Sequence, residues 1–199
     1  MPRTARLTRD DWAAAALAVL SDGGPAAVAV EPVAARLGAS KSSFYWLFKN
    51  RRELLEAALQ RWEQRQTDAV LPRLAAIADP AERLRTLARN AFAATRTADL
   101  ALRLLTESGD PVIRPVVERV TRRRLAVIQA AFTELGHPAG QARHHATAIY
   151  SAYLGTAALR RVDAAPSDSE DYIAALLAAL DVAPAALPIG DHGVGADGE

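Results

Sequence analysis

Cysteine is absent from the 199 residues, and this absence excludes disulfide bonds, a thiol nucleophile and cysteine-based zinc sites. No apolar run approaches the length needed to cross a bilayer, and residues 1–11 lack the apolar segment of a secretory signal. We therefore expect a cytoplasmic protein that has no membrane partner and carries no cofactor.

Strand-like alternation with β-branched residues is also lacking, whereas alanine and leucine are abundant. Both are strong helix formers, so the sequence predicts an all-α fold. Glycine and proline divide the chain into about nine amphipathic helices. The main breaks fall at Gly23-Gly24, Gly38, Pro72, Asp79-Pro80, Gly109-Asp110-Pro111, Gly136-His137-Pro138 and Pro166-Ser167.

Capping patterns mark the first helices. Thr8 and Asp11 have capping-box spacing at the start of the first helix, and Gly38 is suited to end a short second helix. A third helix is expected from Ser40 to about residue 48, and Asn50 is expected to cap a fourth. Two short helices joined by a glycine-containing turn are typical of a helix-turn-helix, whose second helix enters the major groove of DNA.

Charge is distributed unevenly along the chain. The whole sequence carries +1, but residues 1–55 contain eight basic and five acidic side chains and so carry +3, which leaves −2 for the rest. The only two lysines, Lys41 and Lys49, lie in this part. This excess of positive charge indicates a polyanionic partner.

The third helix has two different faces. Phe44, Leu47 and Phe48 share the face that is expected to pack against the core. Their expected partners are Trp12, Leu17, Val33 and Leu37.

The opposite face carries hydroxyl groups, a cation and a phenol, which suit contact with phosphates and base edges. Serines at the helix start also leave backbone N–H groups free for anions. Further basic residues gather at the start of the fourth helix. The expected DNA-binding residues are Ser40, Lys41, Ser42, Ser43, Tyr45, Trp46, Lys49, Arg51 and Arg52. For Trp46 a place in the core is an equal alternative.

The segment VEPVAARLGASKSSFYWLFKNRRELLEAAL resembles the N-terminal DNA-binding domain of the TetR family of bacterial transcriptional regulators. The family pattern is Gly-x-Ser-x-x-x-(aromatic or Leu)-Tyr-x-x-Phe, followed by a capped fourth helix that starts with lysine. The matching positions are Gly38, Ser40, Phe44, Tyr45, Phe48, Asn50, Glu53 and Leu54. Arg51 stands where the family usually has lysine, and Val30 and Glu31 stand where it usually has threonine.

The resemblance implies a role for each matching surface residue and a function for the chain. Tyr45 and Arg51 would bind phosphates, and Lys41, Ser42 and Ser43 would touch bases. The chain would act as a homodimeric repressor that binds double-stranded DNA at a palindromic operator and releases it when a small-molecule effector binds; an activator is the alternative.

Three regions are expected on this basis: a helix-turn-helix DNA-binding domain at 1–53, a helical bundle for ligand binding and dimerisation at 54–182, and a tail at 183–199. The tail is rich in glycine and proline, and we expect it to be disordered.

By the same resemblance, the dimer interface is expected on the last two long helices, at about 138–163 and 167–181. Small residues there permit close helix approach, and larger apolar residues supply the contact surface. The expected dimerisation residues are Ile149, Ala152, Tyr153, Gly155, Leu176, Leu177 and Leu180.

The effector pocket is expected where helices four to eight mix aromatic and polar groups. The candidate ligand-binding residues are Trp62, Phe92, Arg96, Arg103, Glu107, Thr147 and Tyr150, for each of which an ordinary place in the helix core is an equal alternative.

Other patterns carry weaker signals. Three consecutive arginines at 122–124 fan around a helix and favour a solvated or salt-bridged face over a nucleic-acid patch. His144 and His145 point to different faces, which disfavours a shared metal ion. Because no convergent catalytic set is recognisable, we do not expect an enzyme; the alternatives are a small helical enzyme or metal protein without DNA binding, and a helical interaction module.

Overall fold

The computed structural model describes residues 7–182, and all of its regular structure is helical, as predicted. The α-helices are α1 (Arg9–Gly23), α2 (Val30–Leu37), α3 (Lys41–Tyr45), α4 (Arg51–Glu63), α5 (Leu71–Ala75), α6 (Pro80–Ala93), α7 (Thr95–Thr106), α8 (Ile113–Glu134), α9 (Ala139–Arg160) and α10 (Ser169–Ala178). A 3-10 turn, η1 (Pro25–Ala27), and a π-helical turn, η2 (Gln64–Asp68), complete the described elements. The predicted tail at 183–199 lies outside the described residues.

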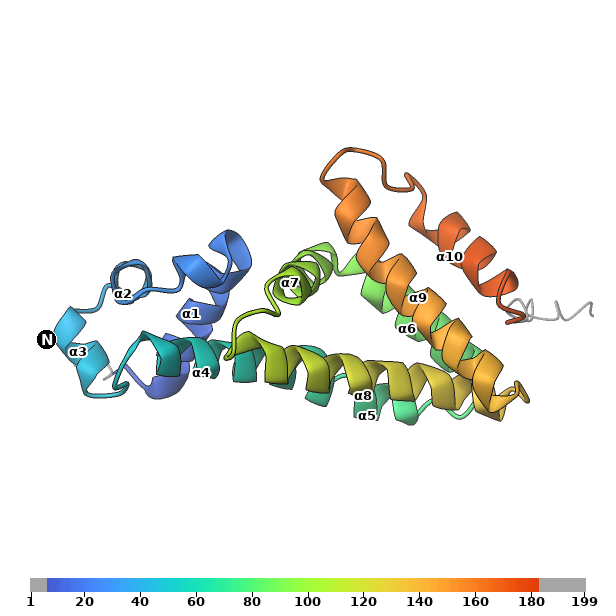
Figure 1. Ribbon diagram of the computed structural model, residues 1–199, viewed down its shortest axis with the longest axis horizontal. Helices are drawn as coiled ribbons and strands as arrows, with labels where there is room; N and C mark the ends of the chain where they lie inside the picture. The colour runs from blue at the N-terminus through green and yellow to red at the C-terminus, as the bar shows by residue number, and fades with distance from the viewer. Residues whose placement is uncertain (1–6, 183–199) are drawn as a thin grey trace, which may run out of the picture.

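Figure 1 shows an elongated arrangement in which α3 lies at one end of the molecule and α8, α9 and α10 lie towards the other. The helix α4 packs on α1 and also on α8, so it belongs to both parts of the fold. It ends in η2, where the backbone adopts π-helical geometry before the short α5 begins. The division at 53/54 stays a prediction, because α4 joins the two parts.

The first four helices pack around an aromatic cluster. The indole ring of Trp12 lies 5.5 Å from the Phe44 ring and 6.5 Å from the Phe48 ring, measured between centroids, and all three side chains are buried. Leu17 and Val33 are buried in the same core. The predicted inward positions of Phe44 and Phe48 are therefore confirmed, whereas Leu37 and Leu47 are half-buried. The helix is shorter than the predicted 40–48, because α3 ends at Tyr45 and Phe48 follows in the turn before α4.

The predicted caps are present. Thr8 and Asp11 form a capping box at the start of α1. The Asn50 side chain accepts a hydrogen bond from the backbone N–H of Glu53 at 3.0 Å. Because each cap satisfies backbone groups that the helix cannot, these residues fix where α1 and α4 begin.

The larger part of the fold is a bundle of α6, α7, α8 and α9, with α10 packed on α6. Its core contains aliphatic and aromatic side chains from all of these helices, among them Leu84, Leu104, Val120, Phe132 and Ile173. Within residues 7–182, every helix is too short or too polar to cross a membrane.

Candidate functional site

The turn between α2 and α3 sets the position of α3, the helix expected to enter the major groove and called the reading helix below. Gly38 adopts φ +62°, in the left-handed region that favours glycine, and its N–H caps the end of α2. Ser40 then accepts a hydrogen bond from the backbone N–H of Ser43 and caps α3. This local chemistry turns α3 sharply away from α2, as in a helix-turn-helix.

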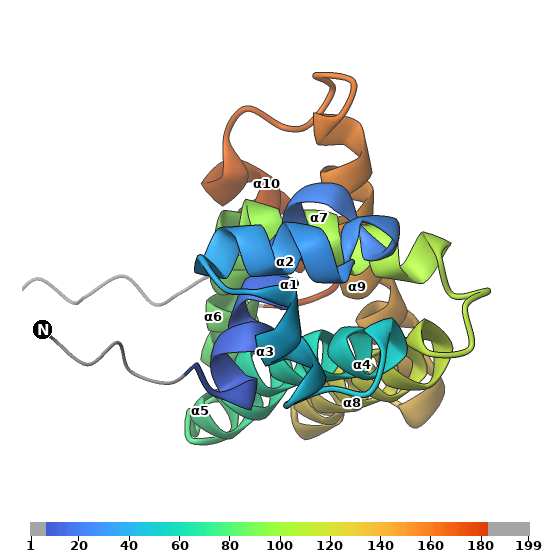
Figure 2. The same cartoon turned by 90° about the vertical axis from the view of Figure 1, so that its left-hand side faces the viewer.

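The outward side of α3 is fully accessible at the end of the molecule, which Figure 2 shows face on. Tyr45 is 66% exposed and Trp46 is 80% exposed. The core alternative for Trp46 is therefore wrong. The Tyr45 ring meets the buried Phe44 ring edge-on at 5.1 Å, and this contact holds the phenol at the surface.

The serine hydroxyl groups of this helix form a local network. The Ser40 and Ser42 hydroxyl oxygens are 2.9 Å apart, and the Ser43 hydroxyl group donates to the Ser40 carbonyl oxygen at 2.7 Å. These bonds are exposed, so water or a nucleic acid competes with them directly. Ser42 faces solvent, while Ser43 is half-buried.

Lys41 forms an ion pair with Glu31 of α2, with 2.6 Å between the ammonium nitrogen and the carboxylate oxygen. Its hydrogen bond lowers the pKa of Glu31 and raises the pKa of Lys41, so both groups are charged at neutral pH. Both side chains are exposed. In the sequence, Glu31 stands out only as a departure from threonine, and its pairing with Lys41 becomes visible in the fold.

The other three predicted cations, Lys49, Arg51 and Arg52, differ in their hydrogen-bond and ion-pair partners. Arg51 donates to the carbonyl oxygens of Val28 and Pro25, each at 2.6 Å, and thus holds the segment before α2 against α4. Arg52 pairs with Glu56 one turn later at 2.9 Å. Among the described residues, no carboxylate lies within 4.0 Å of the Lys49 ammonium group. The two hydrogen bonds of Arg51 use Nε and one Nη nitrogen of its side chain, which is otherwise exposed, so phosphate binding by Arg51 stays a prediction.

Arg9 is a positioning residue that the sequence reading missed. It donates to the Leu47 carbonyl oxygen at 2.6 Å and to Glu53 at 2.9 Å, and its guanidinium carbon lies 4.2 Å from the centre of the Phe48 ring. Glu53 also accepts from the Lys49 backbone N–H at 2.7 Å. Together these contacts fix the turn between α3 and α4.

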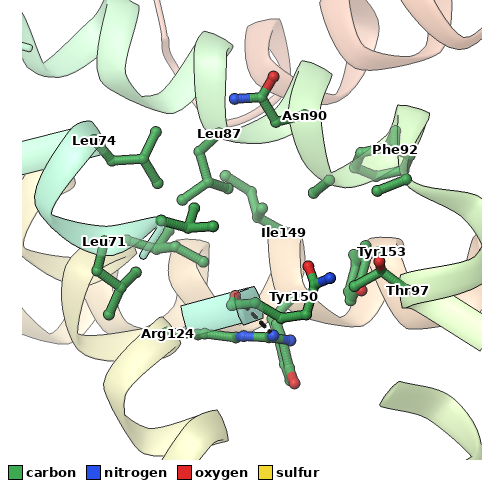
Figure 3. A pocket seen from close by; sticks show the side chains of 15 residues that line it. Leu71, Leu74, Leu87, Asn90, Phe92, Thr97, Arg124, Ile149, Tyr150 and Tyr153 are labelled. Atoms are coloured by element: carbon green, nitrogen blue, oxygen red, sulfur yellow. Dashed lines mark hydrogen bonds between the residues drawn. The ribbon is translucent and has the colours of Figure 1, made fainter. Parts of the chain in front are cut away.

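A second candidate site is an apolar cavity of about 130 Å³ inside the C-terminal bundle (Figure 3). Its walls come from η2, α5, α6, α7, α8 and α9. The lining residues are Gln66, Val70, Leu71, Leu74, Leu87, Asn90, Ala91, Phe92, Ala94, Thr97, Arg124, Ile128, Ile149, Tyr150 and Tyr153.

Two of the seven predicted ligand-binding residues, Phe92 and Tyr150, line this cavity. Trp62 is buried beside it, where its ring faces the guanidinium group of Arg124 at 5.4 Å. Thr147 instead faces solvent and donates to the Arg143 carbonyl oxygen, so it is not a lining residue.

The remaining three predicted ligand-binding residues lie at the junction of the two parts of the fold. Arg96 of α7 pairs with Asp22 of α1 at 2.8 Å. Arg103 and Glu107 lie next to Gly24, close enough that a Cβ atom at Gly24 would fall 2.9 Å from the Arg103 guanidinium group. These residues therefore position α7 against the N-terminal helices instead of lining the cavity.

The predicted dimerisation residues divide into two groups. Ile149, Tyr153 and Leu177 are buried within their own chain, and the first two line the cavity, so they are not available as a dimer surface. The other four are half-buried in this chain: Ala152, Gly155, Leu176 and Leu180. The correction follows from helix geometry, since α9 is apolar on more than one face and only one of these faces points inward.

The consecutive arginines on α8 also differ in their surroundings. Arg123 pairs with Glu63 and Asp68, as a salt-bridged face requires. Arg124 instead lines the cavity and donates to the Gln66 carbonyl oxygen at 3.1 Å. Its place in the cavity was missed because three adjacent arginines give no periodicity from which an inward position is recognisable.

Burial raises the pKa of Tyr153 to about 12, against the opposing effect of the nearby Arg124 guanidinium group. The phenol is therefore neutral at physiological pH and able to donate a hydrogen bond. Residues 7–182 contain no cluster of three or more histidine, aspartate or glutamate side chains placed to hold a metal ion.

The sequence of residues 13–58 matches the family model of bacterial regulatory proteins of the tetR family. Comparison with curated protein sequences gives no match. The sequence match covers the helix-turn-helix and most of α4, which are the elements whose caps and core were predicted from motifs.

Solved structures are similar over most of the chain. A protein from Saccharomonospora viridis in complex with choline has a TM-score of 0.73 and 20% identity, and the alignment covers 85% of this chain and 95% of that one. The regulator FadR from Bacillus subtilis, in complex with stearoyl-CoA, has a TM-score of 0.67 and 16% identity, with 85% and 96% covered. SmeT, the repressor of the Stenotrophomonas maltophilia multidrug efflux pump SmeDEF, has a TM-score of 0.64 and 22% identity, with 87% and 90% covered. Residues 13–58 thus resemble the N-terminal domain of the tetR family, and the chain as a whole has the fold of these solved transcriptional regulators.

Proposed function

We propose that the protein is a homodimeric, cytoplasmic repressor that binds a palindromic DNA operator and releases it when a small molecule occupies the C-terminal cavity. The observation that carries this proposal is the exposure of Lys41, Ser42 and Tyr45 on α3 and of Trp46 directly after it. The helix α3 itself lies at one end of the molecule (Figure 1). Such a surface suits phosphate contacts from the phenol and the cations and base contacts from the first turn of the helix.

The proposal requires a twofold dimer, because two copies of α3 must reach successive major grooves, about 34 Å apart or slightly more. On α9 the half-buried Ala148, Ala152 and Gly155 follow one face of the helix and lead to the exposed Leu159. A Cβ atom added at Gly155 would meet nothing within 4 Å in this chain. The lack of an intrachain reason for glycine there favours close approach of a second copy.

Coupling between ligand and DNA is supported by the contacts that join the two parts of the fold. Asp22 pairs with Arg36 of α2 at 3.1 Å and with Arg96 of α7 at 2.8 Å. The cavity also touches η2, which follows α4 directly. A ligand that shifts α7 or η2 would therefore change how the reading helices are held, and so the operator affinity.

The test is selection of binding sites from a library of random DNA duplexes by the purified full-length protein. The expected product is an inverted repeat with half-site centres about 10 base pairs, or a multiple, apart. Placed over a reporter promoter, this repeat should lower transcription when the protein is present. No enriched motif and no duplex binding at 50 mM salt, a condition that strengthens phosphate contacts, would overturn the proposal.

A further inference from the structure

We infer that the C-terminal cavity binds a small monocyclic carboxylate, whose anionic group is held by Arg124 and whose ring or short chain fills the apolar part. This inference rests on the proposed function for its regulatory meaning, but the binding itself is measured without DNA.

The distribution of groups in the cavity supports an amphipathic anion. Leu71, Leu74 and Leu87 lie on one side, while Arg124 and Tyr150 lie together on another (Figure 3). Arg124 is the only charged residue among the lining residues, and no acidic residue is among them. A molecule with one apolar end and one anionic end therefore matches this cavity better than a wholly apolar molecule or a cation.

Arg124 differs from its neighbours on α8 in its partners. Arg119 and Arg123 both pair with Glu63, and Arg123 also pairs with Asp68. Within the described residues Arg124 has no carboxylate partner within 4.0 Å; its partners are the Gln66 carbonyl oxygen, the face of an indole ring and the Tyr153 hydroxyl group. A half-buried guanidinium group has five donors in a planar fork, and a carboxylate satisfies two of them at once.

The tyrosine phenols add neutral donors near this cation. Tyr153 is buried and keeps its proton at physiological pH. The Tyr150 hydroxyl oxygen lies 3.4 Å from the Thr121 hydroxyl oxygen, and the Tyr150 side chain lies next to Arg124 in Figure 3. These groups offer hydrogen bonds to a carboxylate and place no negative charge against it.

The size of the cavity limits the apolar part of the ligand. A volume of about 130 Å³ is close to the roughly 150 Å³ of an apolar cavity known to hold one benzene ring. A benzoate-sized molecule fits such a space, whereas a long acyl chain requires the walls to move apart. Choline, the ligand of one structural neighbour, would bring its positive charge against Arg124.

The experiment is calorimetric titration of the full-length protein with benzoate, with benzamide as the neutral analogue of the same shape, and with choline. Benzoate is expected to bind at least tenfold more tightly than benzamide or choline, because a charge-assisted pair with Arg124 forms only with the carboxylate. Equal binding of benzoate and benzamide, tighter binding of choline, or no benzoate binding at millimolar concentration would overturn the inference.

Matched variants identify the anchor. Arg124→Gln is expected to remove the preference for benzoate over benzamide, while Arg122→Gln, a change of the same kind at an exposed position of the same helix, keeps it. If Arg124→Gln fails to fold, Ala91→Leu provides the alternative, because it fills the cavity and leaves Arg124 in place. Loss of benzoate binding in that variant supports the cavity as the site, and retained binding overturns it.

The two proposals fail in different ways. A protein that selects an inverted repeat but shows no preference for benzoate remains a DNA-binding regulator with another class of ligand. A protein that binds benzoate through Arg124 but selects no DNA motif keeps the ligand site and loses the regulatory function.

Discussion

Arg124 donates a hydrogen bond to the main-chain carbonyl oxygen of Gln66 at 3.1 Å, which ties the cavity to the π-helical turn at the end of α4. Turns of this kind are rare and frequently mark functional positions. Because α4 also packs on α1 in the N-terminal core, a change at this hydrogen bond can shift α4 and with it the helices that hold α3.

Arg124→Gln should therefore loosen η2 (Gln64–Asp68) even without ligand. The expected result is faster hydrogen exchange of the amides of Ala69 and Val70, which close the turn by bonding to Gln64 and Thr67. Mass spectrometry of exchanged peptides from this segment measures the effect, and Arg122→Gln serves as the control. Unchanged exchange in the Arg124 variant would show that the hydrogen bond does not restrain the turn.

The pair of Glu31 and Lys41 is the second target. Glu31→Gln should tighten binding to every duplex by about threefold to tenfold, because it removes a carboxylate next to the phosphates and frees the Lys41 ammonium group. Fluorescence anisotropy between 50 and 200 mM salt measures this, with Glu118→Gln on α8 as the control for net charge. If Glu31→Gln changes the affinity for DNA by no more than Glu118→Gln does, the effect comes from net charge and not from the pair with Lys41.

Lys41→Ala tests base reading at the same pair. It should cost about 1 to 3 kcal/mol on the selected operator and less on random DNA. Equal losses on both duplexes would assign Lys41 to phosphate contact.

Arg51 should matter more for stability than for DNA binding. Arg51→Ala removes two hydrogen bonds to the carbonyl oxygens of Val28 and Pro25, and we expect the free energy of unfolding to fall by about 1 to 3 kcal/mol. Arg52→Ala, which loses only an exposed pair with Glu56, should change it by less than about 1 kcal/mol. Urea denaturation compares the two variants, and equal stabilities would refute the structural role of Arg51.

These cases show which features are accessible from sequence. The starts of α1 and α4 were predictable because their caps, Thr8 and Asn50, act on residues three positions away, whereas the end of α4 at Glu63, before the π-helical turn, was not. The inward positions of Phe44 and Phe48 were predictable from their spacing of four residues, although only Phe44 lies within α3. The partners of Arg51 were not, since Val28 and Pro25 are brought to it only by the tertiary fold.

The residues that line the C-terminal cavity were harder to predict from the sequence for a related reason. Along α9, Ile149 and Tyr153 alternate with Ala152 and Gly155, so apolar residues occur on both the inward and the outward face. Periodicity identifies an apolar face but does not tell a cavity wall from a dimer surface when both are apolar. Only the packing of α6, α7 and α8 around α9 distinguishes the inward residues from the outward ones.

Gly155 provides the test of the dimer surface. Gly155→Leu should convert the proposed dimer to monomer without unfolding the chain, because the added side chain has open space in its own chain but would separate two helices that pack closely across the proposed interface. Gly140→Leu is the matched control, since Gly140 also lies in α9 with nothing within 4 Å. Sedimentation equilibrium measures the assembly state. If both Gly155→Leu and Gly140→Leu remain dimeric, the interface lies elsewhere.

The buried phenol of Tyr153 predicts a specific dependence of stability on alkaline pH. Its pKa is about 12 in the folded protein and about 10 when unfolded, so between these values the unfolded chain has released a proton that the folded chain still holds. Rising pH therefore favours unfolding, and this residue should cost about 2 to 3 kcal/mol of stability by pH 12 that is fully present below pH 10.

Tyr153→Phe removes the ionisable group and should flatten this loss, although it also removes the contact with Arg124 and so changes stability by a constant amount at all pH values. The difference between the two urea denaturation midpoints, followed from pH 8 to pH 11.5, isolates the titration because the other tyrosines and both lysines are common to both proteins. A difference that stays constant over this range would mean that water reaches the Tyr153 hydroxyl group, and the same cavity would then be open enough to hydrate Arg124 as well.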